Sequence, residues 1–236
     1  MEVSVLKILG IDTSGKIASV AICDENTCLA QTTVLTNLTH SQVILPMVEK
    51  VLDDAFLTLK DIDYFAVANG PGSYTGLRIG ISAVKGMCFT LGKKCIGVST
   101  LESLAYNCLA SKSLIVSVMR ARPEVVYFAS FESDGEKIQT VKKDCVCNVE
   151  EIVKYLNFTQ KDTILVGDYA KEMYEKYFTE SENIRLAPIT MRMQNASSLC
   201  ISAIEKNTFD IPENLKVSYL QITKAEKDLK EKESKV

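Results

Sequence analysis

A loop rich in glycine and proline separates a short apolar stretch from a long one, and it restricts the fold more than any other feature. The loop reads Asn69-Gly70-Pro71-Gly72-Ser73-Tyr74-Thr75-Gly76. The apolar run 64–68 before it has the length and composition of a buried strand. Glycine and proline favour a tight reversal because they adopt backbone angles that bulky residues avoid. We therefore predict a strand, a tight turn and a helix over 75–91, with Ser73 or Thr75 capping its first turn.

The predicted helix after this loop is apolar on nearly every side. Its only charged residues are Arg78 and Lys85, which lie along one line of the helix because they are seven residues apart. Gly76, Gly80 and Ala83 lie on the opposite side, where small residues permit the close approach of another backbone. A surface helix needs an apolar stripe on one side only. Either this helix is enclosed within its own domain, or its sheet covers one side and a second chain covers the other.

A second helix, predicted over 40–57, has the same surplus of apolar surface. Thr39 and Gln42 have the spacing of a capping box, and Pro46 either kinks this helix or delays its start. Apolar residues spread over about half of its circumference, which exceeds the ~100° stripe that burial on one side requires. Two adjacent helices of this kind suggest an interface with another chain.

Composition and charge narrow the classes of function. The chain has 236 residues with a formal net charge of −3, and 47% of the residues are apolar. No apolar run has the length of a membrane span and no basic leader precedes one, so we expect a cytoplasmic protein without membrane contact. The acidic balance disfavours tight, unaided binding to RNA. The eight cysteines include no C-x-x-C pair, which argues against a zinc or dithiol centre.

The apolar periodicity predicts one topology twice. The first pass has the order β-β-β-α-β-α-β, with strands over 5–11, 17–23, 28–35, 64–68 and 94–98 around the two helices above. The second pass has strands over 114–119, 125–131, 137–145 and 163–166, with helices over 149–157, 169–177 and 195–206. We expect an N-terminal lobe over 1–105, a C-terminal lobe over 106–222, and a charged helix or tail over 223–236.

The candidate catalytic residues are few. His40 is the only histidine, and Ile44 stands where a metal-binding helix would carry a second one. A Ser–His–Asp relay would have to use His40, but a single histidine in the first turn of a helix is more often a cap or a polar surface group. No pair of carboxylates is placed for general acid–base catalysis.

The turn that follows the first strand could contact phosphate. Asp12-Thr13-Ser14 is similar to the phosphate hairpin of actin-type kinases, but Ser14 stands where those proteins have glycine. Gly167-Asp168 follows another strand and would be the second phosphate contact. For Asp12-Thr13-Ser14 we favour an ordinary turn held by local hydrogen bonds to the backbone. For Gly167-Asp168, a strand-to-helix turn capped by Asp168 is an equally good explanation.

Several motifs together resemble one known family. They are Ile8-Leu9-Gly10-Ile11-Asp12-Thr13-Ser14, His40-Ser41 with Leu45-Pro46, the run from Gly70 to Gly80, and Ser99-Thr100-Leu101-Glu102-Ser103-Leu104-Ala105. This chain resembles the bacterial TsaB family, also called YeaZ. The likeness is dense over about the first 110 residues and sparser beyond them. The run Gly-Pro-Gly-Ser-Tyr-Thr-Gly-Leu-Arg is its most specific part.

The resemblance implies an α/β fold of the two-lobed actin-like type (ASKHA, ribonuclease-H-like) with duplicated βββαβαβ units. It also implies a scaffold role, without catalysis, in making threonylcarbamoyladenosine next to the tRNA anticodon. The partner would be the catalytic paralogue TsaD, bound as a heterodimer through the N-terminal lobe, and the ATPase TsaE would join that pair. Homodimers would also form, tRNA would be met only indirectly, and no cofactor or metal is expected.

Two sets of site residues follow from these arguments. The expected partner interface comprises His40, Ile44, Met47, Val48, Val51, Arg78, Ile79, Ala83 and Met87, and Ala83→Arg or Val51→Asp is predicted to prevent heterodimer formation. The expected vestigial nucleotide contacts are Asp12, Thr13, Ser14, Gly167 and Asp168. The alternatives are an ATP-dependent kinase or phosphatase that uses Asp12 and Asp168, and a peptidase. Arg120 and Gln221 depart from the family pattern, which has an acidic residue and an arginine there.

Overall fold

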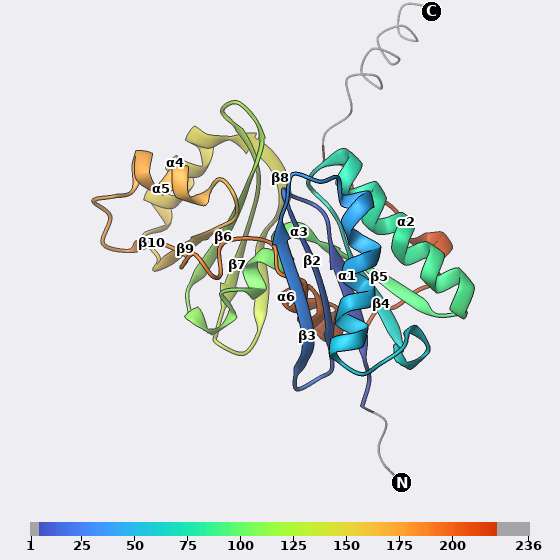
Figure 1. Ribbon diagram of the computed structural model, residues 1–236. Coiled ribbons are helices and arrows are strands. Elements are labelled where there is room, and N and C mark those ends of the chain that lie inside the picture. Colours follow the sequence, from blue (N-terminus) through green and yellow to red (C-terminus); the bar gives the residue numbers. More distant parts are fainter. Residues whose placement is uncertain (1–4, 221–236) are drawn as a thin grey trace, which may run out of the picture.

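The computed structural model describes residues 5–220, which form two mixed β-sheets with helices around and between them (Figure 1). The first sheet has the order β3-β2-β1-β4-β5 and the second the order β10-β9-β6-β7-β8. The strands of the first are β1 (Ile8–Asp12), β2 (Ile17–Cys23), β3 (Cys28–Leu35), β4 (Tyr64–Gly70) and β5 (Lys94–Ser99). Those of the second are β6 (Leu114–Arg122), β7 (Val125–Ser133), β8 (Ile138–Asn148), β9 (Thr163–Val166) and β10 (Ile184–Leu186).

The predicted duplication is confirmed. Each unit has three antiparallel strands, a helix, a strand parallel to the first one, a second helix and a further parallel strand. The helices of the first unit are α1 (His40–Asp54) and α2 (Tyr74–Leu91), and those of the second are α4 (Val149–Thr159) and α5 (Ala170–Tyr177). Together the units form the two-lobed actin-like fold. β10, which completes the second unit, was not predicted, because its three residues are too few to show a periodicity.

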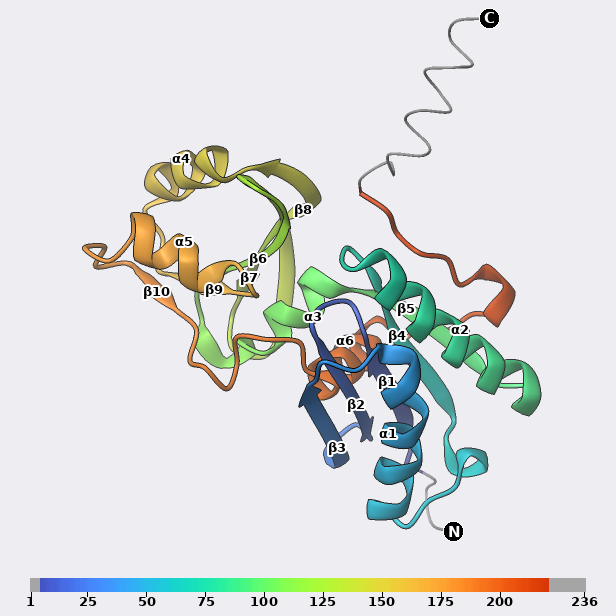
Figure 2. The same cartoon turned by 45° about the horizontal axis from the view of Figure 1, so that its top comes forward.

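Two further helices lie between the sheets, α3 (Thr100–Tyr106) and α6 (Ala196–Lys206) (Figure 2). α3 carries the chain from the first sheet to the second. α6, which the sequence assigns to the C-terminal lobe, packs on the first sheet instead, where Leu199 and Cys200 are buried beside Ile8 and Ala21. Its apolar residues pack there on strands of the first sheet, opposite the face that α1 and α2 cover. The lobe boundary at residue 105 stays a prediction, and 223–236 and Gln221 lie outside the described residues.

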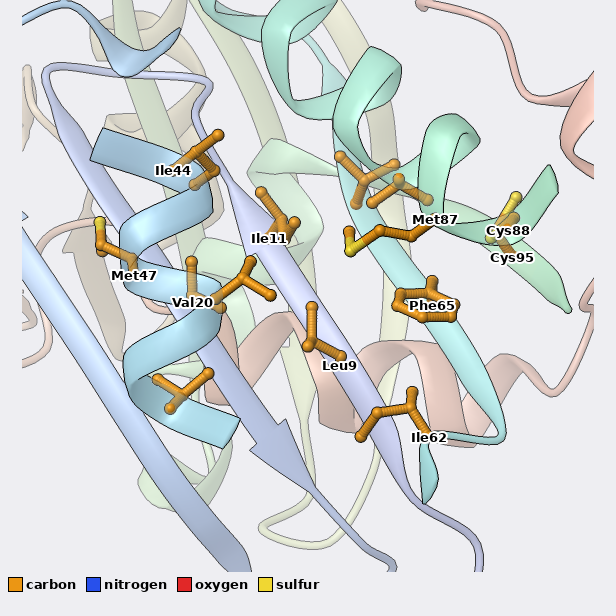
Figure 3. Close-up of a cluster of buried hydrophobic side chains, with 14 of the residues drawn as sticks. Leu9, Ile11, Val20, Ile44, Met47, Ile62, Phe65, Met87, Cys88 and Cys95 are labelled. Atoms are coloured by element: carbon orange, nitrogen blue, oxygen red, sulfur yellow. The ribbon is translucent and has the colours of Figure 1, made fainter. Parts of the chain in front are cut away.

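Helices α1 and α2 cover the other face of the first sheet, and the main hydrophobic core lies between them and this sheet (Figure 3). From α1, Met47, Val48 and Val51 point into this core, and Met87 joins them from α2. They pack on sheet residues such as Leu9, Ile11 and Phe65, so both helices bury their most apolar side within the lobe.

None of the described helices combines the length and the apolar character that crossing a bilayer requires. All eight cysteines belong to the described residues and carry free thiols, and five of them are buried.

Candidate functional site

The loop before α2 sets the position of this helix as predicted. Ser73 is the N-cap, and its Oγ accepts a hydrogen bond from the Gly76 N–H at 3.2 Å. Gly92 ends the helix in the left-handed conformation, with φ of 64°. In α1, the Thr39 N–H donates to Gln42 Oε1 at 3.1 Å, as the capping box requires. Pro46 lies inside α1, so it does not delay the start of the helix.

A groove with a volume of about 600 Å³ runs along the outer surface between α1 and α2. Its lining comprises Ser41, Ile44 and Leu45 from α1, and Tyr74, Thr75, Arg78, Ile79, Ser82 and Ala83 from α2. Leu45 and Tyr74 remain 52% and 43% exposed. The groove therefore presents apolar side chains to the surroundings, with hydroxyl groups and one guanidinium among them.

Four of the residues predicted for a partner interface line this groove: Ile44, Arg78, Ile79 and Ala83. Ile44 lines only its floor, since it is 2% exposed. Four others do not line the groove: Met47, Val48, Val51 and Met87 are at most 9% exposed in the core beneath. The apolar arc of α1 was wide because one part of it faces the sheet and another part the groove. Val51→Asp would therefore test the core rather than an interface.

His40, the remaining predicted interface residue, contacts the turn between β1 and β2. Its Nε2 lies 2.9 Å from the carbonyl oxygen of Gly15. The ring thus joins the first turn of α1 to the turn that resembles a phosphate hairpin, and the interaction is made with backbone rather than with a serine hydroxyl.

That turn is enclosed by the loop before α2. Asp12, Thr13 and Ser14 are at most 1% exposed. Ser14 donates to Asp12 Oδ1 from its backbone N–H at 2.9 Å and from its hydroxyl at 2.6 Å, and the Ser73 N–H donates to the Ser14 carbonyl at 2.7 Å. Burial raises the pKa of the Asp12 carboxyl, and the bonds from Ser14 oppose that rise.

A second cavity, of about 420 Å³, lies between the two sheets. Its lining includes Ser14 and Asp168, and Lys16 and Arg120 add positive charge there. Asp12, Thr13 and Gly167 are not part of its lining. Gly167 has φ of 111°, and a Cβ there would collide with the Val118 carbonyl, so this glycine serves the backbone turn.

Arg120, which departs from the family pattern, is held within the second lobe. Its guanidinium forms an ion pair with Glu172 and lies 4.7 Å from the centre of the Tyr169 ring. Its backbone N–H donates to Asp168 Oδ1 at 2.8 Å. Desolvation raises the pKa of the Asp168 carboxyl, and this backbone bond opposes the rise. Arg120 at the end of β6 thus places a cation beside Glu172 of α5, and its backbone contact to Asp168 is kept.

Sequence reasoning missed the contact of Tyr219 with two residues of the groove. Its ring stacks on Tyr74 with 5.1 Å between ring centres, and it lies beside Arg78. No local signal identifies this contact, because Tyr219 follows α2 by more than 120 residues. Among the described residues, no group of three or more His, Cys, Asp or Glu side chains is placed to hold a metal ion.

Comparison with known proteins gives consistent results. The family model described as TsaD, tRNA N6-adenosine threonylcarbamoyltransferase, matches residues 34–232. The tRNA threonylcarbamoyladenosine biosynthesis protein TsaB of Bacillus subtilis (strain 168) is 28% identical over 224 residues, which cover 94% of this chain and 96% of that protein. The TsaB protein of Haemophilus influenzae is 32% identical over 190 residues, which cover 75% of this chain and 79% of that protein.

Among solved structures, YeaZ from Pseudomonas aeruginosa superposes with a TM-score of 0.78. The match covers 91% of this chain and all of that one, at 24% sequence identity. The two chains therefore share their fold across both sheets.

Proposed function

The chain belongs to the TsaB (YeaZ) family of tRNA threonylcarbamoyladenosine biosynthesis proteins, and from this premise we propose that it is the scaffold subunit that binds and supports a catalytic TsaD subunit. It takes part in the modification of tRNA next to the anticodon, while the transfer of the threonylcarbamoyl group belongs to the partner.

The observation that carries this proposal is the open groove between α1 and α2. Leu45 and Tyr74 are 52% and 43% exposed there. An exposed apolar surface with a polar rim is typical of a site for another protein. Its tyrosine and arginine side chains are the types that protein interfaces favour.

The relation to the TsaD family supports a paralogous partner. The TsaD family model matches residues 34–232, a range that includes both helices of the groove. Two chains of one fold can pair through equivalent helices, so that the α1–α2 face of this chain packs on the corresponding face of TsaD. The same geometry allows two copies of this chain to form a homodimer.

The buried turn at Asp12 supports a role without chemistry of its own. A general base must reach the proton that it removes. Asp12 is fully buried, and one of its carboxylate oxygens is already bonded to Ser14. A kinase that uses Asp12 and Asp168 is therefore disfavoured. We also propose that TsaE joins the assembled pair, and that tRNA is met through TsaD.

Reconstitution of the modification tests the proposal. Threonylcarbamoyladenosine in tRNA is measured with TsaD, TsaE and the adenylate-forming enzyme of the same organism, with and without this chain. We expect modification only with the chain, and we expect it to persist with His40→Ala and Asp12→Ala as long as both variants fold. ATP hydrolysis by the isolated chain that disappears with Asp12→Ala would instead favour the kinase.

A surface variant tests the groove itself. Ala83→Arg places a long cation in the groove, and we expect the variant to fold normally, to lose TsaD in size-exclusion chromatography and to lose modification. Gly86→Arg, an exposed position on α2 outside the groove, is the matched control. Normal complex formation by Ala83→Arg would overturn the groove as the docking site.

A further inference from the structure

Arg78 is held in one orientation at the edge of the groove. Its Nε donates a hydrogen bond to the Tyr219 hydroxyl at 2.8 Å. Its guanidinium carbon lies 4.0 Å from the centre of the Tyr74 ring and 5.9 Å from that of Tyr219. Cation–π contacts and a hydrogen bond thus fix a side chain that would otherwise sample many rotamers.

The segment 215–219 brings Tyr219 to this position. Leu215 is 8% exposed in the core of the first lobe and anchors the start of the segment. The Ser218 N–H donates to the Asn69 carbonyl at 2.7 Å. A Cβ at Gly70 would collide with the Ser218 carbonyl, so the segment lies directly on the loop before α2. The tyrosine is therefore attached to the same rigid loop that starts the helix carrying Arg78.

Among the described residues that line the groove, Arg78 is the only charged one. Within residues 5–220, no carboxylate lies within salt-bridge distance of it, and its single hydrogen bond uses Nε. The two terminal nitrogens keep donors in the fork geometry that binds a carboxylate through two parallel bonds. A guanidinium already fixed by two tyrosines loses little further side-chain entropy when such a contact forms.

We propose that Arg78, oriented by Tyr74 and Tyr219, is a receptor for a carboxylate side chain of the protein that docks in the α1–α2 groove. The partner then presents an apolar helix face with an aspartate or glutamate opposite Arg78. Tyr219 is a positioning residue, and the segment 215–219 belongs to the docking surface. This inference rests on the proposed function, since it assigns the chemistry of the partner at the same groove.

Binding measurements with the TsaD protein of the same organism test the proposal. We expect Arg78→Gln to raise the Kd about 10- to 100-fold, the loss typical of a central arginine contact. Arg78→Lys keeps the charge but not the fork, so it loses most of the same affinity. Tyr219→Phe keeps the ring and removes the hydroxyl, and we expect a smaller rise of about 3- to 10-fold.

The combination Arg78→Gln with Tyr219→Phe separates positioning from direct contact. If Tyr219 acts through Arg78, its replacement changes nothing further once Arg78 is gone. An equal loss in both backgrounds would show that Tyr219 contacts TsaD itself or maintains the fold, and would overturn the positioning role. Replacement of each TsaD carboxylate by its amide is expected to reveal one side chain coupled to Arg78.

Two controls give the remaining outcomes. Lys85→Gln removes the other cation of α2, which does not line the groove, and we expect a change below about twofold. An equal loss there would point to general electrostatic attraction and overturn the proposal. Removal of residues 221–236, whose sequence carries carboxylates, is expected to leave the Kd unchanged. If this removal instead tightens TsaD binding, and the effect depends on Arg78, then the carboxylate that Arg78 binds belongs to residues 221–236. That result also overturns the proposal.

The two proposals fail separately. If Ala83→Arg abolishes binding while Arg78→Gln has no effect, the groove remains the docking site and only the carboxylate receptor is wrong. If Ala83→Arg has no effect, the groove itself is not the docking site.

Discussion

The hydroxyl of Thr13 donates a hydrogen bond to the backbone carbonyl of Gly76 at 2.8 Å, which joins the β1–β2 turn to the first turn of α2. A Cβ at Gly76 would collide with the Thr13 carbonyl oxygen. The two most distinctive motifs of the sequence therefore touch each other through backbone atoms. This contact fixes α2, and with it one wall of the groove, to the end of the first strand.

Gly76→Ala should destabilise the protein by about 2–3 kcal/mol, because the added methyl group meets the Thr13 backbone and neither element can move freely. Gly86→Ala on the same helix is the matched control, since a Cβ there meets nothing within 4 Å. An alanine in a helix loses less backbone entropy than a glycine, so this control should stabilise by about 0.5–1 kcal/mol. Urea denaturation measures both, and equal effects at the two positions would contradict the packing argument.

Val51→Asp and Leu45→Asp should behave differently although both lie on α1. Val51 is completely buried, and an uncompensated carboxylate there should cost at least about 3 kcal/mol of folding free energy. Leu45 is 52% exposed in the groove, so its replacement should cost less than about 1 kcal/mol while weakening TsaD binding. Thermal unfolding and binding are compared for both variants. A folded Val51→Asp protein that fails to bind would restore Val51 to the interface.

The stability gained by Asp12→Asn should depend on pH. The pKa of Asp12 is raised in the folded protein above its ordinary value of 3.8. Between those two values the folded state holds a proton that the unfolded state has released, so stability falls as pH rises through this interval. Asparagine does not ionise and escapes that loss. The difference in Tm, variant minus wild type, should therefore become more positive from pH 4 to pH 7, and a flat or opposite trend would contradict the raised pKa.

The contact between α3 and α6 should contribute measurably to stability. Glu102 accepts a hydrogen bond from the Ser202 hydroxyl at 3.0 Å and lies 2.6 Å from Lys206 Nζ, with its side chain only 17% exposed. Glu102→Gln should lower the free energy of unfolding by about 1–2 kcal/mol, because a largely enclosed charge-assisted bond is lost. The exposed pair Glu132–Lys161 is the control, and Glu132→Gln should cost less than about 1 kcal/mol. Denaturant midpoints of both variants measure these losses, and equal losses of stability would show that enclosure does not strengthen the contact.

Local features of the fold follow from the sequence because their causes are local. Ser73 and the pair Thr39–Gln42 act on backbone groups within four residues, so their spacing was enough to predict the starts of α2 and α1. The repeated strand and helix periods likewise predicted the duplicated units. β10 was missed because a three-residue strand has too few alternating positions to stand out.

The errors in the expected partner interface also arise because a sequence pattern carries no tertiary information. A helical wheel shows how wide an apolar arc is, but not which part of the arc faces the sheet. The expected interface included Val51 but not Leu45, and only the packing of α1 on the first sheet shows that Val51 is buried and Leu45 exposed. The placement of α6 likewise became clear only from the sheet on which its apolar residues pack.

The sequence by itself determined the fold class, the helix ends, the family and the loop that starts α2, since each depends on residues close together in the chain. Only the tertiary structure decided which apolar residues form the core, that the Asp12 turn is closed by the loop before α2, and that Tyr219 holds Arg78. Arg78 and Tyr219, for example, are 141 residues apart, and the free energy of such contacts comes from burial and hydrogen bonds that exist only after both sheets have formed.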